Sequence, residues 1–422
     1  MADDGEGASA WRTGWRDLAL GLPRHHGAAE RGDVAAFEAA VAAREPLQAA
    51  DLAALRPDDV LALALDVLMI EAFARRHAAL LGPSTLERVT SAARDVAARA
   101  GLQPILSYPL YIRHNPMAAG DTRLFTPYPA EERFVRMHRF IEDRFDEVIA
   151  TLEAVVDAPD ALDAYAGAHP GIGAAFARIN RVMAGFRDPE RMPNAVFAEG
   201  FRPYYQSVLD PATGDVLLDG PSGLQSPTFR VVTMLAGYRD ETLDAWTERI
   251  GRYHAPATRQ WLANARVARD AGRALGVVVD RALGVADDLP HLHPSYSSHH
   301  PALIAIARRG GWLTADALDV LAAHGIDAHA WPMGAAPCAM VPAAQPWPDL
   351  DGAARMLAPF AELEAMLFGF HVEHVAVAAV QIGAVRGTGG TSGVEFLQTA
   401  LFRRAFPALW ERGIGARVAA GL

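Results

Sequence analysis

The spacing of apolar residues is the feature that most limits what this chain can fold into. Apolar residues recur every three or four positions, as in residues 59–82 (DVLALALDVLMIEAFARRHAALLG) and 85–101 (TLERVTSAARDVAARAG). This period places them on one face of a helix, and the Gly that closes each run is a usual helix end. Ser84 followed by Glu87 predicts a capping box at the start of the second helix.

The same period continues along the rest of the chain. It predicts helices at residues 130–156, 171–186, 194–208, 225–236, 239–250, 255–282 and 361–382. One stretch, VLDPATGDVLLDGPSG at residues 208–223, has the alternation and turn residues of a β-hairpin. The predicted fold is therefore all-α with a minor β-hairpin.

Composition and proline positions predict the domain organisation. Residues 1–32 are rich in Gly, Asp and Glu and are predicted to be a mobile segment. Prolines interrupt any regular helix in residues 104–129, which we interpret as a joint. We therefore expect a small helical domain at 33–118 and a larger helical domain at 119–422.

Bulk composition excludes several classes of protein. The chain has 422 residues, 51% of them hydrophobic, which is enough for a large core. A formal net charge of −11 argues against nucleic acid as a partner. The single cysteine, Cys338, excludes an intramolecular disulfide. The polar N-terminus shows no secretion signal, and charged residues interrupt the apolar runs too soon for a membrane span. We expect a cytoplasmic protein that binds no membrane, and the oligomeric state stays open.

A histidine in an apolar helical run is the first candidate for chemistry. His374 lies thirteen residues before Gly387, the first residue of a GTGG turn. His371 shares its helical face, so the pair could bind a metal, whereas Glu373 points about 100° away. The alternative is a satisfied core histidine before an ordinary helix–helix loop. A phosphate cradle is disfavoured because nucleotide folds place such a turn directly after a strand.

Two further segments carry candidate residues. Phe134 and His138 are four apart and share one helical face, while Glu142 is assigned to another face; an ordinary amphipathic helix is the alternative. Arg202 precedes Pro203 and is expected near the end of an element, where capping of carbonyls is the alternative role. SGLQSP at 222–227 predicts a tight turn with Ser226 as a helix N-cap. The histidines at 291, 293, 299 and 300 are interpreted as incidental loop residues.

The order and spacing of these segments resemble one family, the histidine-ligated haem dioxygenases, which comprises tryptophan 2,3-dioxygenase and indoleamine 2,3-dioxygenase. The helix, the histidine and the GTGG turn are similar to the C-terminal signature of that family. The resemblance implies haem b as cofactor, with His374 as the ligand of its iron. It further implies that Thr388 contacts the polar backbone groups of an amino-acid substrate and that Gly389 lies against the cofactor.

The other segments resemble further parts of the family. Phe134-x-x-x-His138 is similar to the distal helix of tryptophan dioxygenase, which implies that His138 is catalytic and binds the indole N–H, while Phe134 lines the pocket. FRPYYQ and SGLQSPTFR resemble the arginine that pairs the substrate carboxylate and the turn beside the haem. These imply roles for Arg202 in substrate binding and for Ser222 in both substrate and cofactor binding. ILSYPLYIRHNP resembles the pocket segment of indoleamine dioxygenase and implies that Tyr108 lies near the substrate ring.

Over roughly residues 45–260 the resemblance is strongest to monodechloroaminopyrrolnitrin synthase, a member of the same superfamily. EPLQAADLAALRP, NPMAAG and VFAEGFRPYYQ carry that likeness. One departure concerns the residue three before the iron ligand, where the dioxygenases usually have an arginine that pairs a haem propionate. Here that residue is His371, so another cation must pair the propionate.

The resemblance implies an indoleamine dioxygenase-like helical fold and a haem-dependent oxidoreductase. The expected reaction is dioxygenation of L-tryptophan or a substituted tryptophan or indole across the C2–C3 bond, giving an N-formylkynurenine-type product. The partners would be that small molecule and O2. Two alternatives stay open: haem-dependent monooxygenation or pyrrole-forming rearrangement of a modified tryptophan in secondary metabolism, and a non-catalytic haem- or indole-binding protein.

Overall fold

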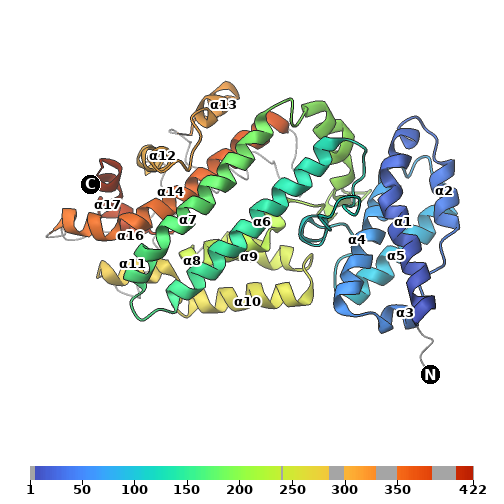
Figure 1. Cartoon of the computed structure of the whole chain (residues 1–422), viewed down its shortest axis with the longest axis horizontal. Helices are drawn as coiled ribbons and strands as arrows, with labels where there is room; N and C mark the ends of the chain where they lie inside the picture. Colours follow the sequence, from blue (N-terminus) through green and yellow to red (C-terminus); the bar gives the residue numbers. More distant parts are fainter. Residues whose placement is uncertain (1–4, 239–240, 285–298, 329–348, 383–404, 422) are drawn as a thin grey trace.

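The fold is nearly all helical, as predicted. The structure is a computed structural model that describes residues 5–238, 241–284, 299–328, 349–382 and 405–421. Within those ranges the strands are β1 (Val208–Leu209) and β2 (Val216–Leu218), which form the expected antiparallel hairpin (Figure 1). The register pairs Val208 with Leu218 and Leu209 with Val216.

Three long helices form the centre of the molecule. Helix α7 (Ala161–Ala184) packs against both α6 (Pro129–Val156) and α14 (Leu350–Gln381), and Figure 1 shows the three running side by side. Shorter helices surround them: α8 (Pro227–Ala236), α9 (Glu241–Gly251), α10 (Pro256–Asp270), α11 (Leu275–Ala282), α12 (His300–Arg309), α13 (Ala317–Ala323), α16 (Pro407–Glu411) and α17 (Ile414–Ala419).

Helix α14 is the core helix of this arrangement. Among the residues that the structure describes, it is long and apolar enough to cross a membrane, judged by length and composition. Within its most apolar window, however, 83% of the residues are buried inside the protein. A helix that is apolar on every side and enclosed by its neighbours is typical of the core of a large protein.

The N-terminal helices form a second group, seen at one end of Figure 1. They are α1 (Gly5–Ala29), α2 (Ala35–Ala42), α3 (Ala49–Ala54), α4 (Pro57–Arg76) and α5 (Pro83–Ala100). The prediction of a mobile segment at 1–32 was wrong for the part described. Trp15, Leu18 and Leu22 lie on one face of α1 and are buried, and α1 packs on α4. Packing of that apolar face outweighs the polar composition of the segment.

Three other local predictions were also wrong. The N-cap of α5 is Gly82, and its N–H is bound by the Glu38 carboxylate at 2.7 Å, so no capping box forms at Ser84. The predicted helix at 194–208 is instead a π-helical turn η3 (Val196–Phe201) followed by a 3₁₀ turn η4 (Arg202–Tyr205). Helix 255–282 is broken between α10 and α11, where Gly272 has a φ of 86°.

Buried hydrophobic residues form two large clusters. One extends from Trp15 to Val135 and also contains residues of η3 and η4, and the other extends from Met137 to Val418. Along the chain the clusters therefore meet on helix α6. The proposed boundary at 118/119 stays a prediction, since residues 192–205 pack with the first cluster although they follow α6 and α7.

The crossing of α14 with the loop before α13 leaves no room for a side chain at Gly369. A Cβ there would lie 2.3 Å from the Trp312 carbonyl oxygen. We expect Gly369→Ala to lower the free energy of unfolding by about 1–3 kcal/mol, although Ala is the better helix former. Urea unfolding measures the change. As the control, Gly167→Ala at an exposed position of α7 meets nothing within 4 Å and should stabilise by up to about 1 kcal/mol. Equal effects of the two variants would contradict the close contact.

Candidate functional site

A cavity of about 580 Å³ lies where the two hydrophobic clusters meet. This volume is within the range of about 300–1,000 Å³ that small-molecule sites occupy. Most of its lining side chains are apolar or aromatic, from α6, α7, α8, α9 and α14 and from the turns η1 (Pro109–Arg113), η3, η4 and η5 (Gly223–Gln225). The six predicted site residues that fall in the described ranges all line this one cavity: Tyr108, Phe134, His138, Arg202, Ser222 and His374.

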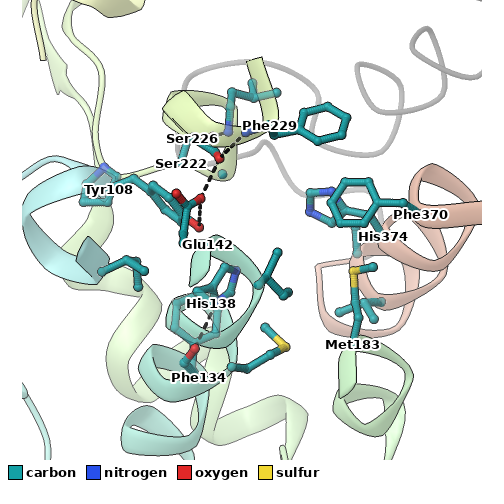
Figure 2. A pocket seen from close by; sticks show the side chains of 18 of the residues that line it. Tyr108, Phe134, His138, Glu142, Met183, Ser222, Ser226, Phe229, Phe370 and His374 are labelled. Carbon is teal, nitrogen blue, oxygen red and sulfur yellow. Dashed lines mark hydrogen bonds between the residues drawn. The ribbon is translucent and has the colours of Figure 1, made fainter. Parts of the chain in front are cut away.

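His374 forms one wall. It lies near the end of α14, and Figure 2 shows its imidazole projecting toward the turn at Ser222. Its Cε1 atom lies 3.7 Å from the position that a Cβ on Gly223 would occupy, so the ring lies close to that turn. Burial lowers the pKa of His374 to about 4. The ring is therefore neutral at pH 7, the state in which imidazole binds a metal.

The neighbours of His374 on α14 face different sides of the helix, as their spacing predicted. His371 also lines the cavity, and its ring meets Phe229 edge-on with centroids 5.2 Å apart. Glu373 faces away and is fully buried, where it pairs with Arg187 and accepts hydrogen bonds from the Thr314 N–H and hydroxyl. Glu373 is thus part of the structural core and not of the cavity.

His138 belongs to another wall, on α6 (Figure 2). Its Nδ1 lies 2.9 Å from the Phe134 carbonyl oxygen. A carbonyl only accepts, so Nδ1 carries the proton of the neutral ring and Nε2 presents a lone pair. Burial lowers the pKa of His138 to about 4, opposed by the bond to Phe134 and reinforced by His374. The Phe134 ring packs against the imidazole with centroids 4.2 Å apart.

Arg202 and Ser222 reach the cavity from turns, as their sequence context indicated. Arg202 begins η4, and burial lowers the pKa of its guanidinium, which remains charged at neutral pH. The Ser222 hydroxyl accepts a hydrogen bond from the Leu224 N–H at 3.3 Å and so caps η5. The predicted N-cap of α8 is confirmed, because the Ser226 hydroxyl accepts from the Phe229 N–H with Pro227 at the first helical position.

The carboxylate of Glu142 is a component of the cavity wall that the sequence reasoning missed. Glu142 is 1% exposed and lines the cavity one helical turn after His138. Its assignment to a different face was wrong, because residues four apart on a helix share a face. It accepts hydrogen bonds from Tyr108, Ser226 and Thr228 and pairs with Arg113 at 3.1 Å.

Tyr108 is held by hydrogen bonds at its backbone and at its hydroxyl. Its backbone N–H donates to Gln225 Oε1 at 2.8 Å, and its hydroxyl donates to Glu142 Oε1 at 3.0 Å. Gln225 in turn donates to the Gly220 carbonyl at 3.2 Å. The middle of the SGLQS turn therefore positions a cavity side chain. The sequence feature that could have indicated this role is Gln225, a long polar side chain in a turn whose other residues are Ser, Gly and Leu.

Several sequence predictions lie outside the described residues. These are Thr388, Gly389 and the rest of the GTGG turn, together with Cys338 and the histidines at 291 and 293. Of the other two loop histidines, His300 is buried and its Nδ1 lies 3.0 Å from the Ala328 carbonyl oxygen. Within the part of the chain that the structure describes, no cluster of three or more His, Cys, Asp or Glu side chains could hold a bare metal ion.

The residues around the cavity fit a haem. A haem iron takes four ligands from the porphyrin and needs one neutral imidazole from the protein, which His374 can supply. The apolar side chains of Phe145, Met183 and Phe370 suit the faces of a macrocycle, and Arg230 and Arg249 in the lining can offset acidic substituents. No family model and no curated protein matches this chain.

The low pKa of His138 predicts how stability depends on pH. The unfolded chain binds a proton at this residue near pH 6.5 and the folded chain near pH 4, so stability is lost as pH falls between these values. We expect His138→Asn to flatten this slope by up to about 1.4 kcal/mol per pH unit. Urea unfolding from pH 7 to pH 5 measures it, with His324→Asn, at an exposed histidine, as the matched control. An unchanged slope in His138→Asn would contradict a buried neutral ring.

Proposed function

We propose that the protein is a haem-dependent oxidoreductase that oxidises L-tryptophan or a substituted tryptophan or indole. The observation that carries this proposal is the convergence of Tyr108, Phe134, His138, Arg202, Ser222 and His374 on one cavity. These residues come from five segments that are separated in the sequence, and each segment resembles a part of the haem dioxygenases. The proposed reaction is addition of dioxygen across the indole C2–C3 bond, giving an N-formylkynurenine-type product.

Each of the chain's own residues has a role in this proposal. Haem b, when bound, supplies the iron that activates dioxygen. His374 holds the cofactor through a neutral imidazole. The Nε2 atom of His138 accepts a hydrogen bond from the indole N–H and so orients the ring. Nε2 is free of a proton because the proton of the neutral ring is on Nδ1, which donates to the Phe134 carbonyl. The apolar walls exclude water and strengthen each polar contact inside.

Arg202 would bind the carboxylate of an amino-acid substrate. A guanidinium can form two parallel hydrogen bonds to a carboxylate, which fixes orientation as well as affinity. The remaining parts of the proposal are a cytoplasmic location and action on a free small molecule, without nucleic acid or membrane as partner. The mass of the product after one turnover distinguishes dioxygenation from monooxygenation or rearrangement.

Haem content of purified variants tests the role of His374. We expect His374→Ala to lose most of the Soret absorbance per protein chain, because the bond from the protein to the iron would be removed. Free imidazole added to this variant should restore haem binding, since it can occupy the space that the side chain leaves.

His371→Ala is the matched control for that experiment, because His371 lies one turn earlier on α14 and lines the same cavity. It should retain most of its haem. Full haem content in His374→Ala without imidazole, or equal loss in both variants, would contradict the proposed ligand. Wild-type protein that purifies colourless and takes up no added haem would overturn the proposal as a whole.

Ligand affinity tests the role of Arg202. We expect Arg202→Ala to raise the Kd for L-tryptophan by about tenfold to a hundredfold, because charge-assisted hydrogen bonds are lost. The Kd for indole, which has no carboxylate, should stay the same. Arg355→Ala, at an exposed position of α14, is the control. An equal loss of affinity for both ligands would argue against carboxylate binding.

A further inference from the structure

The hydroxyl group of Tyr108 donates its proton to the Glu142 carboxylate. The hydroxyl lies 3.0 Å from Glu142 Oε1, and a carboxylate paired with an arginine only accepts. The Ser226 hydroxyl donates to the same oxygen at 2.5 Å. The other oxygen receives the Thr228 hydroxyl at 2.9 Å and Arg113 at 3.1 Å. Glu142 therefore has its four acceptor positions filled and holds the Tyr108 proton in place.

Tyr108 has little freedom to turn that proton elsewhere. Its backbone is bound to Gln225, and its ring meets the His138 ring edge-on, with centroids 5.7 Å apart and planes at 78°. The side chain is buried, and this burial together with Glu142 raises the pKa of Tyr108 well above its usual value. The phenol stays protonated, with its single proton committed to the carboxylate.

The consequence is a wall that offers acceptors to a ligand. The Tyr108 oxygen has only lone pairs left, and so does Nε2 of the neighbouring His138, because the proton of that ring is bound to the Phe134 carbonyl. Both side chains line the cavity. An N–H or O–H group placed here is satisfied, whereas a fluorine or an ether oxygen meets a lone pair and leaves the tyrosine oxygen unpaired.

We propose that the cavity selects an indole with a second hydrogen-bond donor on its ring, as in a hydroxy- or amino-substituted indole. The indole N–H binds His138 and the ring substituent binds Tyr108, while Glu142 is a positioning residue that keeps Tyr108 an acceptor. This inference rests on the proposed function for the indole frame and adds the chemical class of the substituent.

Equilibrium binding to the purified protein tests the inference without any need for turnover. Titration calorimetry compares hydroxyindole isomers with fluoroindole isomers matched in ring position, and indole itself serves as the reference ligand. At the ring position that faces Tyr108, we expect the hydroxyl compound to bind about fivefold to tenfold more tightly than its fluoro partner.

Three variants separate the hydroxyl from the rest of the site. Tyr108→Phe keeps the ring and should reduce the hydroxyl preference to within about twofold, with fluoroindole affinity unchanged or improved. Tyr165→Phe, at a buried tyrosine that lies against Phe360 outside the cavity, should keep the preference. Glu142→Gln introduces an amide that can donate, which releases the Tyr108 proton and should lower the preference or reverse it. If Glu142→Gln fails to fold, Tyr108→Phe alone decides.

The outcomes distinguish this inference from the proposed function. Equal affinity of hydroxyl and fluoro partners at every ring position, with indole still bound, overturns the donor preference and leaves the proposed function standing. A preference that survives Tyr108→Phe overturns it as well, since another group must then bind the hydroxyl. Failure of indole and of all its derivatives to bind overturns the proposed function, and this inference with it.

Discussion

Two carboxylates buried on helix α6 determine how the cavity is built. Removing a carboxylate from water costs several kcal/mol unless donors replace the lost hydration. Glu131, which is fully buried, accepts from Tyr111 and from the backbone and hydroxyl of residues 125–126. Glu142 accepts from Tyr108 and from the start of α8. Each carboxylate therefore ties a non-helical segment to α6, and the cavity lies among the segments tied in this way.

The long helices then hold the two histidines in separate walls. His138 projects from α6 and His374 from α14, and α7 packs against both helices. Side chains on packed helices are positioned more closely than side chains on loops, which a site with two opposed imidazoles requires. The same burial keeps both rings neutral, so His374 can bind a metal and His138 can accept a hydrogen bond.

The sequence was informative where a local pattern determines the structure and failed where distant contacts do. Apolar period predicted α6 closely, and the SGLQSP pattern predicted the N-cap at Ser226. Helix α1 was missed because its apolar face is stabilised by packing on α4 and by distant partners such as Tyr204, which binds the buried His26 at 2.8 Å. Glu142 was misplaced although its spacing from His138 was sufficient to place it. Its four donors lie on other segments and could not be read from α6 alone.

The distribution of positive charge bears on how the proposed haem site could do without an arginine at position 371. Arg202, Arg230 and Arg249 line the cavity, and Arg249 is partly offset by Asp219 at 2.7 Å. A haem propionate and a substrate carboxylate each require a cation in a site of low polarity. Because the lining supplies cations from η4, α8 and α9, anchoring of the proposed cofactor would not depend on the residue three before its proposed iron ligand. That position of α14 can then hold His371, whose imidazole packs on Phe229.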